Sequence, residues 1–155
     1  MPTVAPPKVD TDAAAARSNG HSSRTFESRR VLLVDDNHDS REMYRAVLRA
    51  HGHEVCEAPD GERALALMQQ RAGERPLDIA FIDIGLPGGM DGYELARRIR
   101  KLPSGREVRL VALTGYGFPE DRQQSKLAGF ARHLVKPVEP EALQRELSAV
   151  SSCAH

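Results

Sequence analysis

Four segments of the chain place a carboxylate, a hydroxyl or an ammonium group at the end of an apolar run. Asp35 and Asp36 follow RVLLV, and Asp83 ends IAFID. Thr114 ends RLVALT, and Lys136 follows HLV. Three carboxylates in one place repel one another unless a cation lies among them or some are protonated. Mg²⁺ prefers oxygen ligands, and a carboxylate can attack a phosphoryl group as a nucleophile. Brought together, these residue types are suited to phosphoryl transfer.

The elements around these residues alternate between two patterns five times. The segments with the apolar content of strands are RVLLVDD, HEVCEA, LDIAFIDI, EVRLVALTG and ARHLV. The segments with helical spacing are SREMYRAVLRAHG, GERALALMQQRA, GYELARRIRKL, PEDRQQSKLAG and PEALQRELSAV. Such alternation predicts an α/β fold with right-handed crossovers, in which a doubly wound five-stranded parallel sheet carries five helices. Ligands bind beyond the carboxyl ends of such strands. The polar strand ends are therefore expected at one edge of the molecule.

Apolar spacing within the helical segments predicts which side chains are buried. In the first helical segment, Met43 and Val47 are four residues apart, as are Tyr44 and Leu48. Side chains at this spacing lie on one face of a helix. We therefore expect Met43, together with Met68 of the second helical segment, to lie in the core.

Composition divides the chain into three parts. Residues 1–28 are rich in Pro, Ala, Ser and Thr and nearly lack large apolar residues, which predicts a disordered N-terminal leader. Residues 29–150 carry the alternating pattern and are predicted to form one domain, followed by a short tail over 151–155. The chain has 22 basic and 22 acidic residues, so its charge balance indicates neither a nucleic-acid partner nor a membrane surface. With no apolar leader segment and two cysteines outside any metal-binding spacing, the expected location is the cytoplasm.

The motifs VLLVDD, FIDIGLPGGMDGYEL, VALTGYG and HLVKP occur in this order and resemble the receiver domain of two-component response regulators, of the chemotaxis-regulator type. The likeness covers residues 29–150, and the wording of TGYG and HLVKP is similar to receivers of hybrid sensor kinases. The resemblance implies the flavodoxin-like receiver fold. It also implies that Asp83 is the phosphoacceptor, and that Asp36, Asp83 and the main-chain carbonyl of Gly85 bind Mg²⁺, with Asp35 acting through the outer shell.

The same resemblance gives roles to residues on the other strands. Thr114 would be the switch hydroxyl and Lys136 the lysine that contacts the phosphoryl group, with a cis bond between Lys136 and Pro137. His133 would occupy the position that rearranges on switching, where an aromatic residue is common. Gly85 and Tyr116 would tune the access of water and hence the rate of dephosphorylation.

These roles lead to a set of functional expectations. Nineteen residues follow Lys136, too few for an output domain, so we expect a single-domain response regulator of a phosphorelay. Its expected partners are a histidine kinase or a histidine phosphotransfer protein and a downstream protein target. A homodimer through the fourth helix, fifth strand and fifth helix is a further expectation. The chain is not expected to be an enzyme beyond slow self-phosphorylation and self-dephosphorylation.

Three other functions compete with this interpretation. The alternative we retain is a receiver-like interaction module that works without phosphorylation. An aspartyl phosphatase would need a second acid two residues after the nucleophile, where this chain has Gly85. A dinucleotide-binding module would need a glycine-rich turn after the first strand, and this chain has VDDNHD there.

Overall fold

Five parallel strands form a single sheet in the order β2-β1-β3-β4-β5. The structure, a computed structural model, describes residues 28–71, 73–115 and 122–150. Its strands are β1 (Arg30–Val34), β2 (Glu54–Ala58), β3 (Ile79–Asp83), β4 (Arg109–Thr114) and β5 (Phe130–Val135). The expected five-stranded α/β architecture is therefore confirmed, while the expected leader up to residue 27 and the tail lie outside the described residues.

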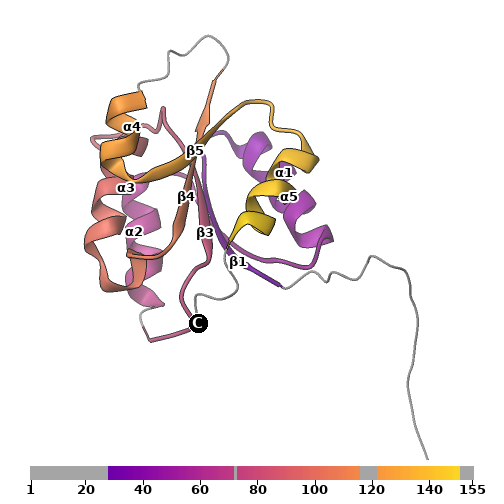
Figure 1. The fold of residues 1–155 in the computed structure, drawn as a ribbon, viewed down its shortest axis with the longest axis horizontal. Helices are drawn as coiled ribbons and strands as arrows, with labels where there is room; N and C mark the ends of the chain where they lie inside the picture. Colours follow the sequence, from indigo (N-terminus) through magenta and orange to yellow (C-terminus); the bar gives the residue numbers. More distant parts are fainter. Residues whose placement is uncertain (1–27, 72, 116–121, 151–155) are drawn as a thin grey trace, which may run out of the picture.

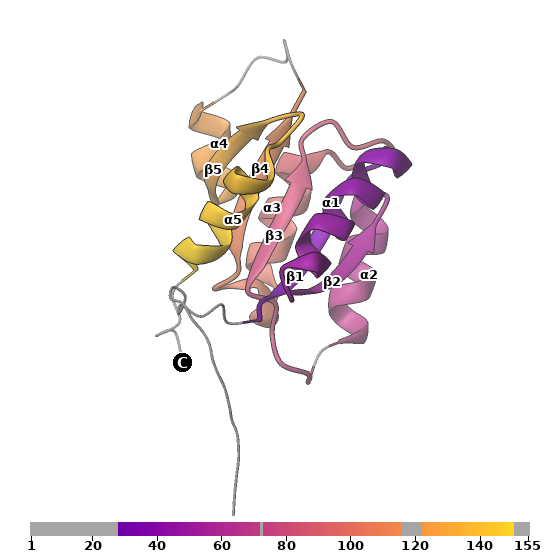
Figure 2. The same cartoon turned by 90° about the vertical axis from the view of Figure 1, so that its right-hand side faces the viewer.

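Helices cover both faces of the sheet (Figure 1). On one face lie α1 (His38–Ala50) and α5 (Pro140–Ala149), and on the other lie α2 (Gly61–Gln70), α3 (Gly92–Lys101) and α4 (Arg122–Ala128). A short 3-10 helix, η2 (Pro103–Gly105), follows α3. Seen after a quarter turn, the strands run side by side between these two layers (Figure 2). Among the described helices none is long and apolar enough to cross a membrane.

Three helices begin at a polar side chain that accepts a backbone hydrogen bond. Asn37, Asp60 and Asp91 precede α1, α2 and α3, and each side chain accepts from the N–H three residues later. Such capping satisfies a donor that the first helical turn leaves without an intrahelical partner. Asn37 directly follows Asp35 and Asp36, so the cap fixes where α1 leaves the sheet edge.

The core consists of two apolar layers, one on each side of the sheet. Met68 is 4% exposed and belongs to the layer beneath α2 and α3, as expected. The expectation for Met43 was wrong, because its side chain is 48% exposed. The residues of α1 that face the sheet are Tyr44 and Leu48, which are 2% and 0% exposed. Met43 precedes Tyr44 by one residue and is therefore rotated by about 100° away from the buried face.

The guanidinium group of Arg100 joins the end of α3 to the segments that follow it. It donates to the carbonyl oxygens of Gly105, Val108 and Gly129 at 2.8, 2.7 and 3.1 Å. Burial lowers the pKa of Arg100. Because Gly129 ends α4 with a positive φ of 99°, this one side chain ties α3, the start of β4 and the end of α4 together.

His53 is a buried imidazole between α1 and β2, 6% exposed. Its Nδ1 accepts from the backbone N–H of Arg29 at 3.0 Å, while its Nε2 is buried without a hydrogen-bond partner among the described residues. Burial, with the nearby charges of His51 and Arg29, lowers the pKa of His53 below its ordinary value of 6.5. The folded protein therefore resists protonation at this position.

This imidazole predicts a loss of stability in mild acid. Below pH 6.5 the unfolded chain binds a proton at this histidine that the folded chain does not bind. The free energy of unfolding therefore decreases as the pH is lowered, by at most about 1.4 kcal/mol per pH unit. Urea titrations at pH 7.5 and 5.5 would measure this slope. His53→Asn keeps an acceptor for Arg29 and should flatten the slope, whereas the exposed His51→Asn should change the slope less, because burial is the largest cause of the lowered pKa of His53. Equal slopes in wild type and His53→Asn would contradict the expectation.

Candidate functional site

The polar residues at the strand ends meet at one edge of the sheet. Asp35 and Asp36 follow β1, and Asp83 is the last residue of β3, next to β1 in the sheet. One carboxylate oxygen from each of the three lies within 4.8 Å of the others. Asp35 is fully buried and Asp83 is 8% exposed, while Asp36 is exposed. The structure therefore brings together the three carboxylates that the sequence singled out.

Lys136 lies between two of these carboxylates. Its Nζ is 2.8 Å from Oδ2 of Asp35 and 3.0 Å from Oδ2 of Asp83, to which it donates a hydrogen bond. Two carboxylate charges about 4 Å apart repel by roughly 4 kcal/mol at an effective dielectric constant of 20. The ammonium group offsets this repulsion, which explains how two buried carboxylates coexist here.

Burial and ion pairing shift the pKa values of Asp35 and Lys136 in opposite directions. Burial raises the pKa of Asp35, and the contacts with Lys136 and with the N–H of Asn37 only partly counter it. Burial alone would lower the pKa of Lys136, but its contacts with Asp35 and Asp83 outweigh burial and raise it. Lys136 is therefore held in its charged form within the site.

Backbone groups orient the two buried carboxylates. Oδ1 of Asp35 accepts from the N–H of Asn37 at 2.9 Å, and Oδ1 of Asp83 accepts from the N–H of Gly85 at 2.9 Å. Oδ2 of Asp35 is different, since it is buried and has no aligned hydrogen bond, only the ion pair with Lys136. In both Asp35 and Asp83, Oδ1 is thus held by a backbone N–H, while Oδ2 faces Lys136.

Thr114 and Lys136 are joined through their main chains. The N–H of Lys136 donates to the carbonyl of Thr114 at 2.7 Å, and the Thr114 hydroxyl donates to the carbonyl of Leu134 at 3.5 Å. The bond between Lys136 and Pro137 is cis, as the family resemblance implied. Thr114 is 4% exposed and ends β4, next to β3 and therefore next to Asp83.

His133, at the proposed switch position, points to α4. Its Nε2 lies 2.9 Å from the hydroxyl of Ser125, a buried residue of α4, and its ring centroid is 6.0 Å from that of Phe130. His133 is half-buried in β5 and lies opposite Ala112 in the register with β4. Tyr116, which was expected together with Gly85 to tune the rate of dephosphorylation, lies outside the described residues.

Gly85 is exposed, and its missing side chain leaves space next to Asp83. A Cβ at this position would lie 3.7 Å from Oδ1 of Asp83, an ordinary van der Waals distance, and would meet no other atom within 4 Å. A Cβ at residue 85 therefore fits without a clash and would lie next to the carboxylate.

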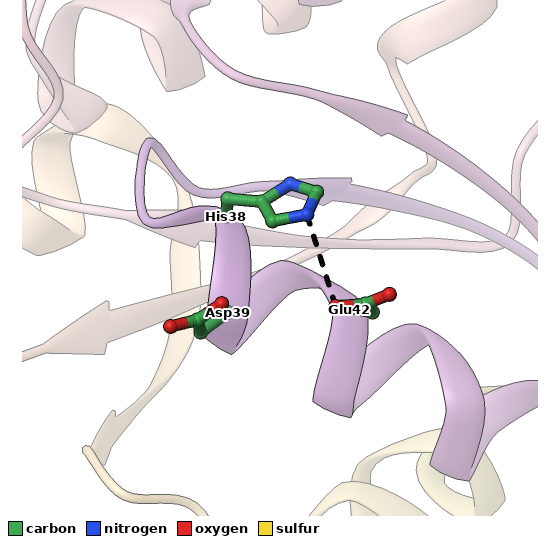
Figure 3. A group of neighbouring side chains, drawn as sticks. All are labelled: His38, Asp39 and Glu42. Carbon is green, nitrogen blue, oxygen red and sulfur yellow. Dashed lines mark ion pairs between the residues drawn. The ribbon is translucent and has the colours of Figure 1, made fainter.

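A second group of metal-ligating side chains lies on the first turn and a half of α1 (Figure 3). His38, Asp39 and Glu42 are all exposed, and Nε2 of His38 is 3.7 Å from Oε1 of Glu42. The pair is the ordinary i, i+4 contact of a solvated helix surface. Burial distinguishes the strand-end group from this one, because only there are carboxylates withdrawn from water next to an ammonium group.

Sequence reasoning missed two side chains that support the site. Arg41 donates to the carbonyl of Asp35 at 2.8 Å and to Glu57 at 2.9 Å, and so ties α1 to β1 and β2. The hydroxyl of Tyr44 accepts from the N–H of Val138 at 3.0 Å. A buried tyrosine usually finds a partner for its hydroxyl, so Tyr44 carried a signal, but nothing in the sequence named the partner.

Comparison with known proteins places this site in a family. The response regulator receiver domain model matches residues 31–148. The protein PilH of Pseudomonas aeruginosa is 33% identical over 123 residues, which are 78% of this chain and 96% of PilH. The chain also matches longer proteins. It is 36% identical to a gliding motility regulatory protein of Myxococcus xanthus over 107 residues, 69% of this chain and 13% of that protein.

Solved structures agree with the fold. The chemotaxis protein CheY4 of Vibrio cholerae superposes with a TM-score of 0.72 at 33% identity, covering 81% of this chain and all of that one. The receiver domain of the sensor histidine kinase PA1611 of Pseudomonas aeruginosa gives a TM-score of 0.68 at 33% identity, covering 80% and 98%. That structure has a magnesium ion coordinated in its active-site cleft. The chain belongs to the response regulator receiver family.

Proposed function

We propose that this receiver domain accepts a phosphoryl group on Asp83 from a phosphohistidine, in the presence of Mg²⁺, and so serves a two-component phosphorelay. The observation that carries the proposal is the position of the Asp83 carboxylate. It lies at a strand end, next to the ammonium of Lys136 and close to two further carboxylates, and Asp83 is 8% exposed. A nucleophile with a fixed cation beside it is suited to receive a charged phosphoryl group.

The donor set at the strand ends fits a magnesium ion. Asp35, Asp36 and Asp83 offer hard oxygen ligands within 4.8 Å of one another, and Oδ2 of Asp35 is a buried oxygen without an aligned hydrogen bond. Asp36, Asp83 and the carbonyl of Gly85 would hold the ion directly, with Asp35 in the outer shell. Mg²⁺, when bound, would offset charge on the phosphoryl oxygens.

The transfer itself makes one bond and breaks one. A carboxylate oxygen of Asp83 bonds to phosphorus as the phosphorus–nitrogen bond of the phosphohistidine breaks, and the imidazole leaves with the electron pair. Lys136 contacts the incoming phosphoryl oxygens, and the Thr114 hydroxyl, at the end of the neighbouring strand, donates to one of them. The domain would catalyse no more than slow self-phosphorylation and self-dephosphorylation.

The output of phosphorylation would be a changed protein-binding face. Movement of Thr114 toward the phosphoryl group would open space for His133, which now contacts Ser125 of α4. The face formed by α4, β5 and α5 would then shift between two populations. Leu127 and Val135 on this face are 76% and 56% exposed, which suits a downstream protein target or a second copy of the chain. We place this exchange in the cytoplasm, where a histidine kinase or a histidine phosphotransfer protein would be the donor.

The proposal is tested by the intact mass of the wild-type chain after incubation with acetyl phosphate. We expect one added phosphoryl mass that appears with Mg²⁺ and is absent when the metal is chelated. No adduct from acetyl phosphate or from a panel of phosphohistidine donors would overturn the proposal and favour the interaction module that works without phosphorylation.

Gly85→Met is expected to lengthen the lifetime of the phosphorylated state several-fold. A side chain at residue 85 begins 3.7 Å from Asp83 Oδ1 and would cover the path of the hydrolytic water. Decay of the added mass after removal of the donor measures the lifetime. Gly89→Met is the matched control from the same loop, since a Cβ at Gly89, unlike one at residue 85, has no atom of Asp83 within 4 Å. A lifetime unchanged by Gly85→Met would contradict this role.

A further inference from the structure

The segment that carries Lys136 is attached to two different elements. On one side, the N–H of Lys136 donates to the carbonyl of Thr114 in β4. Pro137 has no N–H, so the next main-chain donor is Val138. Its N–H donates to the hydroxyl of Tyr44 in α1 at 3.0 Å, a buried hydrogen bond between residues 94 positions apart. Lys136 is therefore held between a strand end and a side chain of α1.

The hydroxyl of Tyr44 is a fixed point in the fold. The ring is 2% exposed and belongs to the apolar cluster between α1, α5 and the sheet, which also contains Val138 and Leu143. A packed tyrosine ring keeps few rotamers, so the position of its hydroxyl follows the position of α1. In turn, α1 begins at His38, two residues after Asp36.

Two contacts thus join the same pair of segments. The first is the ion pair between Lys136 and Asp35 at 2.8 Å, and the second is the hydrogen bond between Val138 and Tyr44. We propose that Tyr44 is a positioning residue for phosphoryl transfer, because its hydroxyl fixes the main chain beside Lys136 and so holds the ammonium 3.0 Å from Asp83. This inference rests on the proposed phosphoacceptor function of Asp83.

Tyr44→Phe removes the hydroxyl and keeps the ring. We expect the rate constant for phosphorylation by acetyl phosphate at saturating Mg²⁺ to fall about five- to tenfold, since misplacement of a charged group by less than 1 Å weakens its effect on the transition state. In that reaction an Asp83 oxygen bonds to phosphorus and acetate leaves with the electron pair. The Mg²⁺ dissociation constant, measured by calorimetry, should change less than about twofold, because the hydroxyl that is removed bonds to Val138 and not to an expected ligand.

Two comparisons separate positioning from general loosening of the fold. Tyr93→Phe is the matched control, since Tyr93 is a 7% exposed tyrosine of α3 on the opposite face of the sheet, and this variant should keep the wild-type rate. In a Lys136→Ala background, Tyr44→Phe should lower the residual rate less than about 1.5-fold, because the group it positions is gone. Amide exchange at Val138 should speed up in Tyr44→Phe, whichever background is used.

The outcomes distinguish this inference from the proposed function. If wild type is not phosphorylated at all, the proposed function fails. If wild type is phosphorylated and Tyr44→Phe is equally fast, or if Tyr44→Phe slows Lys136→Ala as much as it slows wild type, the positioning role of Tyr44 is overturned. If the rate constant falls together with Mg²⁺ affinity and with the midpoint of urea unfolding, Tyr44 acts only by stabilising the fold, which also overturns it.

Discussion

Asp83→Asn is expected to abolish phosphorylation, leaving less than about 1% of the wild-type adduct after the same incubation, because an amide oxygen is a far weaker nucleophile than a carboxylate. The substitution keeps the shape of the side chain and its acceptor for the N–H of Gly85. It removes one of the carboxylates that contact Lys136, whose ion pair with Asp35 remains. The variant should therefore fold, which circular dichroism and urea unfolding would verify.

Intact mass after incubation with acetyl phosphate and Mg²⁺ measures this loss, and peptide mapping of the wild-type adduct locates the phosphoryl group. Asp39→Asn is the matched control, because Asp39 is an exposed carboxylate on the adjoining turn of α1 outside the strand-end group. It should be phosphorylated like wild type. An adduct that persists in Asp83→Asn would move the acceptor to another residue and contradict the assignment.

Gly92→Ala is expected to destabilise the fold by about 3 kcal/mol and to slow phosphorylation. A Cβ at Gly92 would lie 2.6 Å from the carbonyl oxygen of Asp83 and 2.7 Å from the Cα of Ile84. Both neighbours are main-chain atoms, one in the last residue of β3 and one in the residue after it, and main-chain atoms cannot rotate aside. Residue 92 opens α3, so the added methyl group would push the helix and the acceptor strand apart.

Urea unfolding gives the free energy, and the acetyl phosphate assay gives the rate. Gly89→Ala is the control from the same loop, since its Cβ would meet nothing within 4 Å, and it should change stability by less than about 0.5 kcal/mol. Gly61→Ala offers a graded comparison, because its Cβ would meet the flexible side chain of Met90 rather than main chain. Equal stability of Gly92→Ala and Gly89→Ala would refute the close packing of α3 on β3.

The architecture and the strand-end group could be predicted from the sequence because both depend on short-range patterns. The alternation of apolar runs with helical spacing specifies strands and helices, and parallel strands place their carboxyl ends together. Asp35, Asp83 and Lys136 each stand at the end of an apolar run, so their convergence followed from the topology alone. The roles of Thr114 and His133 came from the family resemblance and remain predictions.

Other features of the structure depend on contacts between segments that are distant in the sequence, so no local sequence pattern could predict them. Met43 and Tyr44 both fit an apolar helical spacing, but only the packing of α1 against the sheet decides that Tyr44 is buried and Met43 is exposed. The hydrogen bond between Tyr44 and Val138 spans 94 residues. Arg100 likewise finds its carbonyl partners in η2, just before β4 and at the end of α4 only after these elements have docked.

The position of β5 at the border of the sheet has a consequence for solubility. Among the described strands β5 pairs with β4 alone, and most of its side chains are exposed or half-exposed. An unpaired strand edge can template addition of a strand from another molecule, which leads to aggregation. Arg132 disfavours such strand addition, because its charged side chain is 57% exposed and forms an ion pair with Glu146 of α5 at 3.0 Å. A foreign strand added here would pack next to that charge, so the border of the face that we propose to shift on phosphorylation is also protected against fibre-like self-association.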